Sequence, residues 1–204
     1  MDSELPRRSN AGYGAAAREL VEQYESVSFA EVHHEVLHLY PDRPSAVLDV
    51  GAGSGRDAAA LAALGHRVTA VEPTPELRVL GEQRHARWPI AWVDDELPGL
   101  PVLAARPERF DLVLLTAVWM HLDRAERAAA MATLAALLRP AGRVVLSLRH
   151  GPVPPGRRMF DVTAAETVEL AAEHGLALLH RAERGDLHGR GGVSWTWLGF
   201  AAAA

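Results

Sequence analysis

The 204-residue chain contains no cysteine and no lysine. Without cysteine it can form no disulfide, and it offers no thiolate as a metal ligand or nucleophile. Without lysine it can form no Schiff base, and it lacks the lysine of nucleotide-binding phosphate loops. All 21 basic side chains are arginines, against 26 acidic ones, and the formal net charge is -5 at pH 7. This acidic balance argues against a general nucleic-acid binder, so we expect no nucleic-acid partner.

Long apolar runs are also missing, since no stretch reaches the roughly 18 residues of a membrane span. The N-terminal residues 1–10 are polar and charged, unlike a secretory signal. We therefore expect a cytoplasmic protein without membrane attachment. The hydrophobic content of 49% is enough for a full core. The length predicts one domain over residues 1–204, in which residues 1–40 form a helical cap and residues 46–200 form the core.

Short apolar runs alternate with helical segments along the chain. The predicted strands are 46–50, 68–71, 90–93, 110–116, 143–148, 176–180 and 193–200. The predicted helices are 15–23, 29–39, 56–64, 75–84, 124–138 and 164–174. This alternation indicates an α/β fold with a Rossmann-like, doubly wound sheet. Residues 151–158 hold three prolines and two glycines and are predicted to form a loop.

A glycine turn stands between the first core strand and the helix after it. Gly51, Gly53 and Gly55 let the backbone turn tightly and let a ligand approach without a Cβ in the way. Glu72 ends the next strand, 21 residues after Gly51. A carboxylate at that place can accept hydrogen bonds from both ribose hydroxyls. The turn and Glu72 together predict a site for a nucleoside cofactor, whereas the turn alone could be purely structural.

The spacing of the glycines separates two classes of cofactor. Dinucleotide-binding turns follow the pattern G-x-G-x-x-G, but here the third glycine comes one residue early, as G-x-G-x-G. The chain also shows no second dinucleotide-binding half. A nicotinamide oxidoreductase is therefore a remote alternative.

Five segments, in order along the chain, resemble motifs of the class I methyltransferases that use S-adenosylmethionine. They are residues 49–55, Glu72, and residues 94–98, 110–116 and 138–144. The resemblance covers residues 46–148, and the closing pair of strands fits it too. It implies a seven-stranded sheet in the order 3-2-1-4-5-7-6, with strand 7 antiparallel. It also implies S-adenosyl-L-methionine as cofactor and S-adenosyl-L-homocysteine as product.

The same resemblance implies roles for individual residues. Asp49 and the glycine-turn backbone would hold the methionine portion, Glu72 the ribose, and Asp94 or Asp95 the adenine. The cofactor-binding residues expected in this way are Asp49, Gly51, Ala52, Gly53, Gly55, Glu72, Pro73, Asp94, Asp95, Thr116 and Ala117. Asp57, at the next helix start, is interpreted either as a ligand or as a favourable charge for the helix dipole.

Two histidines are candidate general bases. Methyl transfer mainly needs alignment and desolvation, with a base only where the nucleophile carries a proton. His121 follows the fourth predicted strand and His150 ends the fifth, and imidazole titrates near neutral pH. The alternatives are a His121 that packs on the cofactor or bonds to backbone, and a His150 that belongs to loop structure.

Candidate substrate contacts lie at the same edge of the predicted sheet. Arg149, Arg157 and Arg158 could hold a carboxylate or phosphate, or simply be solvated. Tyr24, like Tyr13, could cover the pocket from the N-terminal helices, or pack in the core.

Other distinctive side chains are interpreted as structural. His33, His34 and His38 suggest metal ligands, but no further ligand has matching spacing, so we expect a plain helix face and no metal. Trp195 and Trp197 alternate on the last strand and are interpreted as packing residues.

Taken together, the sequence predicts a methyltransferase that uses S-adenosylmethionine and acts on a small molecule. The alternatives are a methyltransferase for protein or RNA, and a non-catalytic protein that binds the cofactor. Substrate identity, the accepting atom and the oligomeric state stay open.

Overall fold

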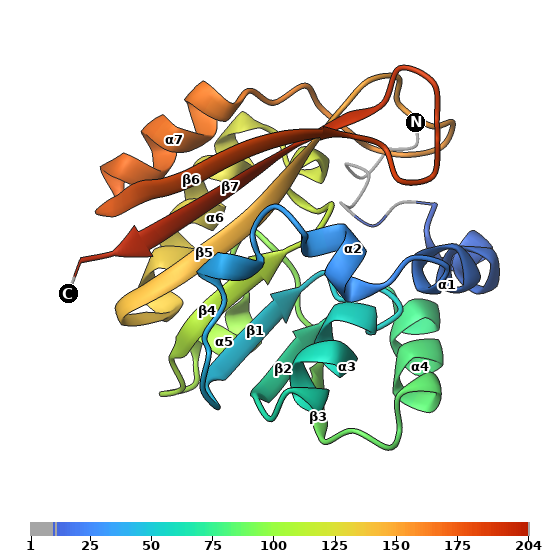
Figure 1. Ribbon diagram of the computed structural model, residues 1–204, viewed down its shortest axis with the longest axis horizontal. Helices are drawn as coiled ribbons and strands as arrows, with labels where there is room; N and C mark the ends of the chain where they lie inside the picture. The colour runs from blue at the N-terminus through green and yellow to red at the C-terminus, as the bar shows by residue number, and fades with distance from the viewer. Residues whose placement is uncertain (1–9, 11, 204) are drawn as a thin grey trace, which may run out of the picture.

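A computed structural model describes residue 10 and residues 12–203, and in them seven strands form one sheet (Figure 1). The strands are β1 (Ala46–Val50), β2 (Arg67–Val71), β3 (Ile90–Val93), β4 (Phe110–Leu115), β5 (Leu138–His150), β6 (Leu176–Gly185) and β7 (Ser194–Ala202). Their order is β3-β2-β1-β4-β5-β7-β6. Strand β7 runs antiparallel to both β5 and β6, and the other neighbouring pairs are parallel. The predicted fold class and strand order are confirmed.

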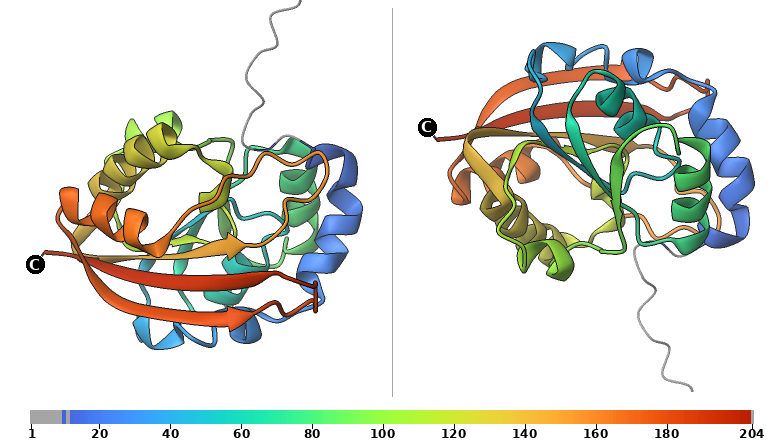
Figure 2. Two further views of the ribbon diagram at one scale, coloured as in Figure 1. Left: turned by 90° about the horizontal axis from the view of Figure 1, so that it is seen from above. Right: turned by 90° about the horizontal axis from the view of Figure 1, so that it is seen from below.

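Helices cover both faces of this sheet (Figure 2). The α-helices are α1 (Ala17–Glu25), α2 (Phe29–His33), α3 (Arg56–Ala63), α4 (Pro75–Arg84), α5 (Pro101–Ala104), α6 (Arg124–Leu137) and α7 (Ala164–Glu173). Short 3-10 helices are η1 (Gly14–Ala16), η2 (Leu37–Leu39) and η3 (Trp119–His121). Within the described ranges, no helix has both the length and the hydrophobicity needed to cross a lipid bilayer.

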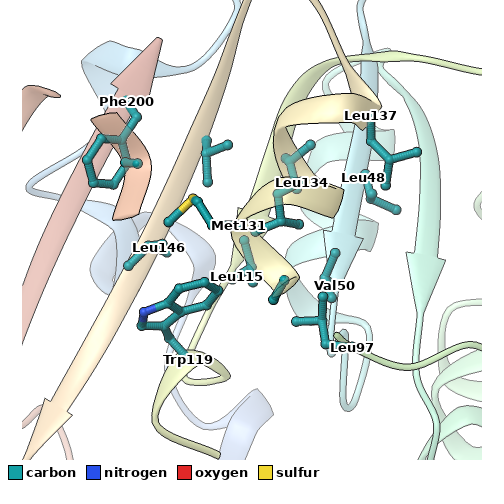
Figure 3. Packing of buried hydrophobic residues seen from close by; sticks show 14 of the residues in the cluster. Leu48, Val50, Leu97, Leu115, Trp119, Met131, Leu134, Leu137, Leu146 and Phe200 are labelled. Carbon is teal, nitrogen blue, oxygen red and sulfur yellow. The ribbon is translucent and has the colours of Figure 1, made fainter. Parts of the chain in front are cut away.

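The larger part of the core lies between the sheet and helices α6 and α7 (Figure 3). Leu48 and Val50 of β1 and Leu146 of β5 face Met131 and Leu134 of α6 there. Because β1 is buried along its whole length, its residues are almost uniformly apolar. The one exception, Asp49, lies on the other face and is therefore available to a site.

The opposite face of the sheet is covered by α2, η2 and α3. Val36 and Leu39 pack there against Leu61 of α3 and Trp197 of β7. Helix α1 instead packs on α4, through Ala17 and Val21 against Leu77. Figure 1 shows α1 beside α4, past the carboxyl ends of β1 and β2. Of the N-terminal helices, α2 and η2 therefore cover one face of the sheet, whereas α1 lies at the carboxyl ends of its strands.

Several predicted boundaries are wrong, for local reasons. The predicted helix 29–39 divides into α2 and η2, and α5 was not predicted at all. Strand β5 begins earlier than predicted, at Leu138, which pairs with Phe110 of β4. The register then shifts, and regular pairing resumes between Arg143 and Leu112. Strand β6 extends to Gly185. Its second half, residues 181–185, consists of charged and small residues on the sheet edge, so no apolar run marks it.

Candidate active site

A cavity of about 430 Å³ opens at the carboxyl ends of β1, β2 and β4. This is the edge at which open α/β sheets bind their ligands. Three connecting segments complete its wall: the chain around Tyr13, the loop that carries Arg157, and the β6–β7 connection around Leu187. The loop that carries Arg157 and the β6–β7 connection lie against each other. Gly151 of the loop is so close to the Gly192 carbonyl that a Cβ on Gly151 would overlap it. The cavity thus has a floor of strand ends and a roof of connections.

The glycine turn forms part of the floor, and its backbone explains its composition. Gly51, Gly53 and Gly55 have φ angles of 72°, 58° and 84°, a region that strongly favours glycine. The amides of Gly51 and Ala52 both donate to the Val71 carbonyl, at 2.8 and 2.9 Å. These bonds fix the turn to the end of β2. Gly51, Ala52 and Gly53 line the cavity, whereas Gly55 does not and instead begins α3 beneath it.

Glu72 lies in the cavity wall with only 5% of its surface exposed. Its carboxylate accepts the amide N–H of Gly53 at 2.9 Å and that of Thr74 at 2.8 Å. Burial nevertheless raises the pKa of this carboxyl above its ordinary value. A carboxylate offers about four acceptor positions, so two remain for hydroxyl groups of a ligand. Pro73, the next residue, also lines the cavity.

Asp49 is the second buried acid in the wall. It is 1% exposed, and its Oδ2 has no hydrogen-bond partner within the described part of the chain. Burial, together with the nearby negative charge of Asp57, raises the pKa of Asp49 well above its usual range. A buried acceptor without a partner is costly unless a ligand satisfies it. Asp49 is therefore suited to receive a cationic donor such as an ammonium group.

Asp57 is the centre of a buried network below Asp49. Its Oδ2 lies 2.9 Å from Nε2 of His33 and accepts the Thr116 hydroxyl at 2.8 Å, and its Oδ1 accepts Nε–H of Arg56 at 2.7 Å. The Arg56 and His33 contacts hold the pKa of Asp57 far below its ordinary value, against the effect of burial. Asp57 is thus an internal counter-ion that also borders the cavity.

The three histidines of the predicted helix 29–39 differ from one another. The prediction of a plain helix face is wrong for His33, which is fully buried and also contacts the Tyr40 hydroxyl through Nδ1, at 2.7 Å. His34 is exposed, and the His38 ring lies edge-on to that of His180, 4.6 Å between centroids. Sequence spacing could not distinguish the three.

The end of β4 carries two further residues of the expected cofactor set. Thr116 and Ala117 both line the cavity. Ala117 has a φ angle of 60°, which is unfavourable for a residue with a Cβ, and its amide donates to the Ser147 hydroxyl at 2.8 Å. That contact stabilises the sharp turn that leads from β4 into η3.

The two neighbouring acids after β3 occupy different surroundings. Asp95 is buried in the cavity wall, where it accepts the amides of Glu96 and Leu103 at 3.0 and 2.9 Å. The Asp94 side chain is 66% exposed and pairs with Arg78 at 2.9 Å, outside the cavity. Of the two acids expected near the adenine, Asp95 borders the cavity and Asp94 does not.

His121 lies in the cavity wall and is held at both ring nitrogens. Its Nδ1 is 2.7 Å from the Arg158 carbonyl, and its Nε2 is 2.9 Å from the Tyr13 hydroxyl. A carbonyl can only accept, so Nδ1 carries the proton, and Nε2 of the neutral ring accepts from Tyr13. Burial, then the charges of Arg157, Arg158 and Arg149, lower the pKa of His121. The ring therefore carries its lone pair at Nε2, where it accepts the Tyr13 hydroxyl at the edge of the cavity.

His150 lies elsewhere. It is at the end of β5 in a separate shallow depression, and its Nε2 is 2.8 Å from the Thr196 hydroxyl. The structure does not bring it together with His121 or with the acids of the floor.

Of the three arginines predicted to contact the substrate, two lie in the cavity wall and one does not. Arg149 and Arg157 line the cavity, as does Tyr24. Arg158 does not: its Nη1 donates to Glu126 and to the His121 carbonyl, each at 2.8 Å. Arg158 thus fixes the loop to α6 and supplies the backbone carbonyl that orients His121.

Sequence reasoning missed the contribution of the β6–β7 connection. Asp186, Leu187, His188 and Arg190 of this connection line the cavity, together with Trp195 and Trp197 of β7. The two tryptophans, interpreted from sequence as packing residues, thus also border the site. Asp186 organises the connection, since it accepts from Arg190 and from the Trp195 indole, at 2.6 and 3.0 Å to Oδ1. No periodic pattern in residues 185–192 indicates this arrangement.

Comparisons with known proteins agree with this geometry. Residues 47–142 match the family described as "Methyltransferase domain". The ubiquinone biosynthesis O-methyltransferase of Methylocella silvestris is 34% identical over 96 residues, a match that spans 47% of this chain and 36% of that relative. The family match over residues 47–142 runs from β1 to the irregular start of β5, and so includes the glycine turn, Glu72 and His121.

Solved structures extend the likeness over the whole chain. The 1,6-didemethyltoxoflavin-N1-methyltransferase of Burkholderia thailandensis, with bound 1,6-didemethyltoxoflavin and S-adenosylhomocysteine, is 26% identical at a TM-score of 0.68, covering 100% of this chain and 94% of that one. Magnesium protoporphyrin IX methyltransferase of Synechocystis PCC 6803 is 17% identical at a TM-score of 0.67, with 100% and 87% covered, and shares the fold. Residues 47–142 thus match a methyltransferase domain, and over its whole length the chain shares the fold of these two solved methyltransferases.

Proposed function

We propose that this protein transfers the methyl group of S-adenosylmethionine to a small-molecule acceptor. The observation that carries the proposal is the cavity floor, where a glycine turn, the buried Glu72 and the unsatisfied Asp49 face one space. The Burkholderia relative, which spans the chain, contains both a small acceptor and S-adenosylhomocysteine. A cytoplasmic location remains a prediction from the sequence.

The floor residues fit the parts of this cofactor. The free Oδ2 of Asp49 would accept the ammonium group of the methionine portion, and Glu72 would accept the ribose hydroxyls. The missing side chain of Gly53 would let the cofactor lie close to the backbone of the turn. A Cβ at this position would lie 3.3 Å from the Tyr24 ring and would fill the space between them. Asp95, with Leu97 beside it, would border the adenine. The cofactor supplies a methyl group that its sulfonium already activates for displacement.

The protein's own part in the reaction would be alignment and proton removal. His121 would accept the acceptor's proton at Nε2, since its Nδ1–H is already committed to the Arg158 carbonyl. The Tyr13 hydroxyl, which now bonds to Nε2, would share or yield that position to the acceptor. His150 and Arg158 have no such access, so we assign them no direct role.

The roof favours a small acceptor over a protein or an RNA. Connections around Tyr13, Arg157 and Leu187 border the same cavity as the cofactor residues. A volume of about 430 Å³ lies in the range of small-molecule pockets and has to accommodate cofactor and acceptor together. A macromolecular acceptor would have to insert a single side chain or base beneath these segments.

Thermal unfolding with added ligands tests the cofactor assignment. S-adenosylhomocysteine at 100 times its Kd should add about 2.7 kcal/mol of stability, a rise of roughly 5–10 °C in Tm. Glu72→Ala should weaken binding by about 1.5–3 kcal/mol, because a charge-assisted contact is lost. Asp94→Ala, outside the cavity, is the matched control and should bind normally. A shift with NAD and none with S-adenosylhomocysteine would refute the proposal.

Incubation with labelled cofactor and fractionated cell extract tests the acceptor class. Label in the small-molecule fraction is expected. Label in protein or RNA alone would favour a macromolecular acceptor, and binding without transfer to any fraction would favour a non-catalytic protein.

A further inference from the structure

Two arginines in the cavity wall lack an anionic partner among the residues described. Arg149 of β5 is 8% exposed, its Nε is buried without a hydrogen bond, and its Nη1 reaches only the Gly151 carbonyl, at 3.4 Å. Arg157 lies with its guanidinium carbon 3.6 Å from the centre of the Tyr13 ring, and its buried Nη1 also has no partner. Guanidinium groups held in this way keep N–H donors that no described residue accepts, and these donors are available to an anionic ligand.

Three other arginines near the cavity, unlike Arg149 and Arg157, lie close to a carboxylate. Arg158 pairs with Glu126 at 2.8 Å, Arg190 with Asp186 at 2.6 Å, and Arg184 approaches Glu35 at 3.7 Å. Each of them therefore has a carboxylate nearby. Among the described residues no carboxylate lies within ion-pair distance of Arg149 or Arg157, although the charge of Asp186 acts on Arg149 from farther away. Leaving a buried charge without a direct partner is unfavourable.

The charges of Arg149 and Arg157 both act on the contact between Tyr13 and His121. Burial raises the pKa of the Tyr13 hydroxyl, and the charges of both arginines act against that rise. Burial lowers the pKa of the His121 ring, and the same two charges lower it further. The Tyr13 hydroxyl and the His121 ring are joined by a 2.9 Å hydrogen bond. The two arginines come from different elements, the end of β5 and the loop over it, so the fold and not local sequence brings them together. The wall around this point is otherwise largely apolar, with Met120, Met159, Leu187 and Trp195.

We propose that the acceptor is a small molecule with an apolar body and one oxyanion, a carboxylate or phosphate, bound by Arg149 and Arg157 beside His121. The inference rests on the proposed function, because it assigns the acceptor half of the same cavity. Two guanidinium groups suit an oxyanion, since each presents N–H donors in a planar fork. The apolar wall suits the rest of the molecule.

Acceptor binding would then also act on the base. The groups that face His121 are the Tyr13 hydroxyl, the Arg158 carbonyl and the charges of Arg149, Arg157 and Arg158. An oxyanion between Arg149 and Arg157 offsets part of that positive charge. The pKa of His121 therefore rises when the acceptor binds, and the ring becomes a stronger base in the complex than in the free protein.

Binding of defined probes to the protein saturated with S-adenosylhomocysteine tests this site. The probes are benzoate, phenyl phosphate and the uncharged benzamide, and the readout is Tm. At tenfold over its Kd an anionic probe should raise Tm by about 3–5 °C, and benzamide should not. Arg149→Gln and Arg157→Gln should each weaken the anion's binding about 10- to 100-fold. Arg106→Gln, an exposed arginine, is the matched control and should change nothing.

The outcomes separate the two proposals. Stabilisation by benzoate alone assigns a carboxylate, and by phenyl phosphate alone a phosphate. If S-adenosylhomocysteine stabilises the protein but neither anion does more than benzamide, or if both glutamine variants respond like the wild type, the oxyanion site is overturned and the proposed function stands. If S-adenosylhomocysteine itself has no effect, the proposed function fails first.

Discussion

The hydroxyl of Tyr13 lies 2.9 Å from Nε2 of His121, although 108 positions separate the two residues in the sequence. Their rings meet edge to face, with centroids 5.5 Å apart. The contact connects the N-terminal segment to the end of β4 across the cavity. It places a hydroxyl where an acceptor's proton-bearing group would have to lie, so both side chains can be tested for a part in turnover.

Replacing either partner should separate binding from chemistry. His121→Asn should lower turnover of labelled cofactor about 10²- to 10⁴-fold and leave the affinity for S-adenosylhomocysteine nearly unchanged, because a base acts only in the chemical step. Tyr13→Phe should lower turnover less, about tenfold, because the base remains. His174→Asn, exposed at the end of α7, is the control. Loss of affinity with unchanged turnover in His121→Asn would mean that the ring only packs.

The stability of the ligand-free protein should depend on pH through the His121 ring. The pKa of His121 is lowered by burial and by the nearby arginines, so the folded protein binds its proton less tightly than the unfolded chain does. This histidine therefore contributes stability that is complete above about pH 6.5, the unfolded value, and is lost as the pH falls toward the folded pKa. Urea unfolding between pH 5 and 8 measures the slope. The His121→Asn variant should lose that part of the slope, and an unchanged slope would contradict the prediction.

Asp49→Asn should stabilise the free protein while abolishing cofactor binding. The pKa of Asp49 is raised in the folded state, so its ionisation weakens folding as the pH rises above the unfolded value of about 3.9. Asparagine removes that cost and should add about 1 kcal/mol at pH 8. It also removes the acceptor for an ammonium group. The measurement is Tm with and without S-adenosylhomocysteine, with the exposed Asp42→Asn as control; a lower Tm for the free variant would contradict the argument.

Gly53→Ala should damage the cofactor site beyond its backbone strain. Its φ of 58° costs a residue with a Cβ about 1–2 kcal/mol, and the added carbon would lie 3.3 Å from the Tyr24 ring inside the cavity. Gly175→Ala is the matched control, because Gly175 has a φ of 74° and nothing within 4 Å of an added Cβ. Both variants should lose similar stability, and only Gly53→Ala should lose affinity for S-adenosylhomocysteine, by tenfold or more. Equal affinities would mean that the ligand does not approach this glycine.

Asp57→Ala should be among the most destabilising substitutions in the floor. It leaves the buried His33 and the mostly buried Arg56 without their shared carboxylate, a loss of about 3–5 kcal/mol for a broken buried ion pair. Denaturant unfolding measures this. Glu183→Ala, whose carboxylate pairs with the exposed Arg181, is the comparison and should cost much less. Similar losses would show that the network around Asp57 adds little.

The sequence predicts the floor of the cavity much better than its roof. Gly51, Gly53 and Glu72 are recognisable because a turn between strand and helix restricts residue type, and because strand ends meet at one edge of a parallel sheet. The positive φ of Ala117 has no such signal, since alanine rarely adopts it. The same holds for Leu187 and Arg190, which reach the cavity only because the β6–β7 connection folds back over it.

Long-range pairing decides the remaining roles. The pairing of His33 with Asp57 joins two helices, and that of Arg158 with Glu126 joins a loop to α6. These elements meet only in the folded chain. Spacing along one helix therefore could not show that His33 is buried, nor that Arg158 turns away from the cavity while Arg157 faces it.

The two amides that fix the glycine turn to Val71 have a consequence for how such a protein diversifies. They attach the turn to the strand that carries Glu72, so this half of the site depends on the sheet itself. The other half is made by connections that contribute little to the sheet's pairing. A library restricted to residues 152–157 and 186–190 should therefore yield folded variants that retain cofactor affinity while their acceptor preference changes, and new specificities would be accessible without first rebuilding the fold.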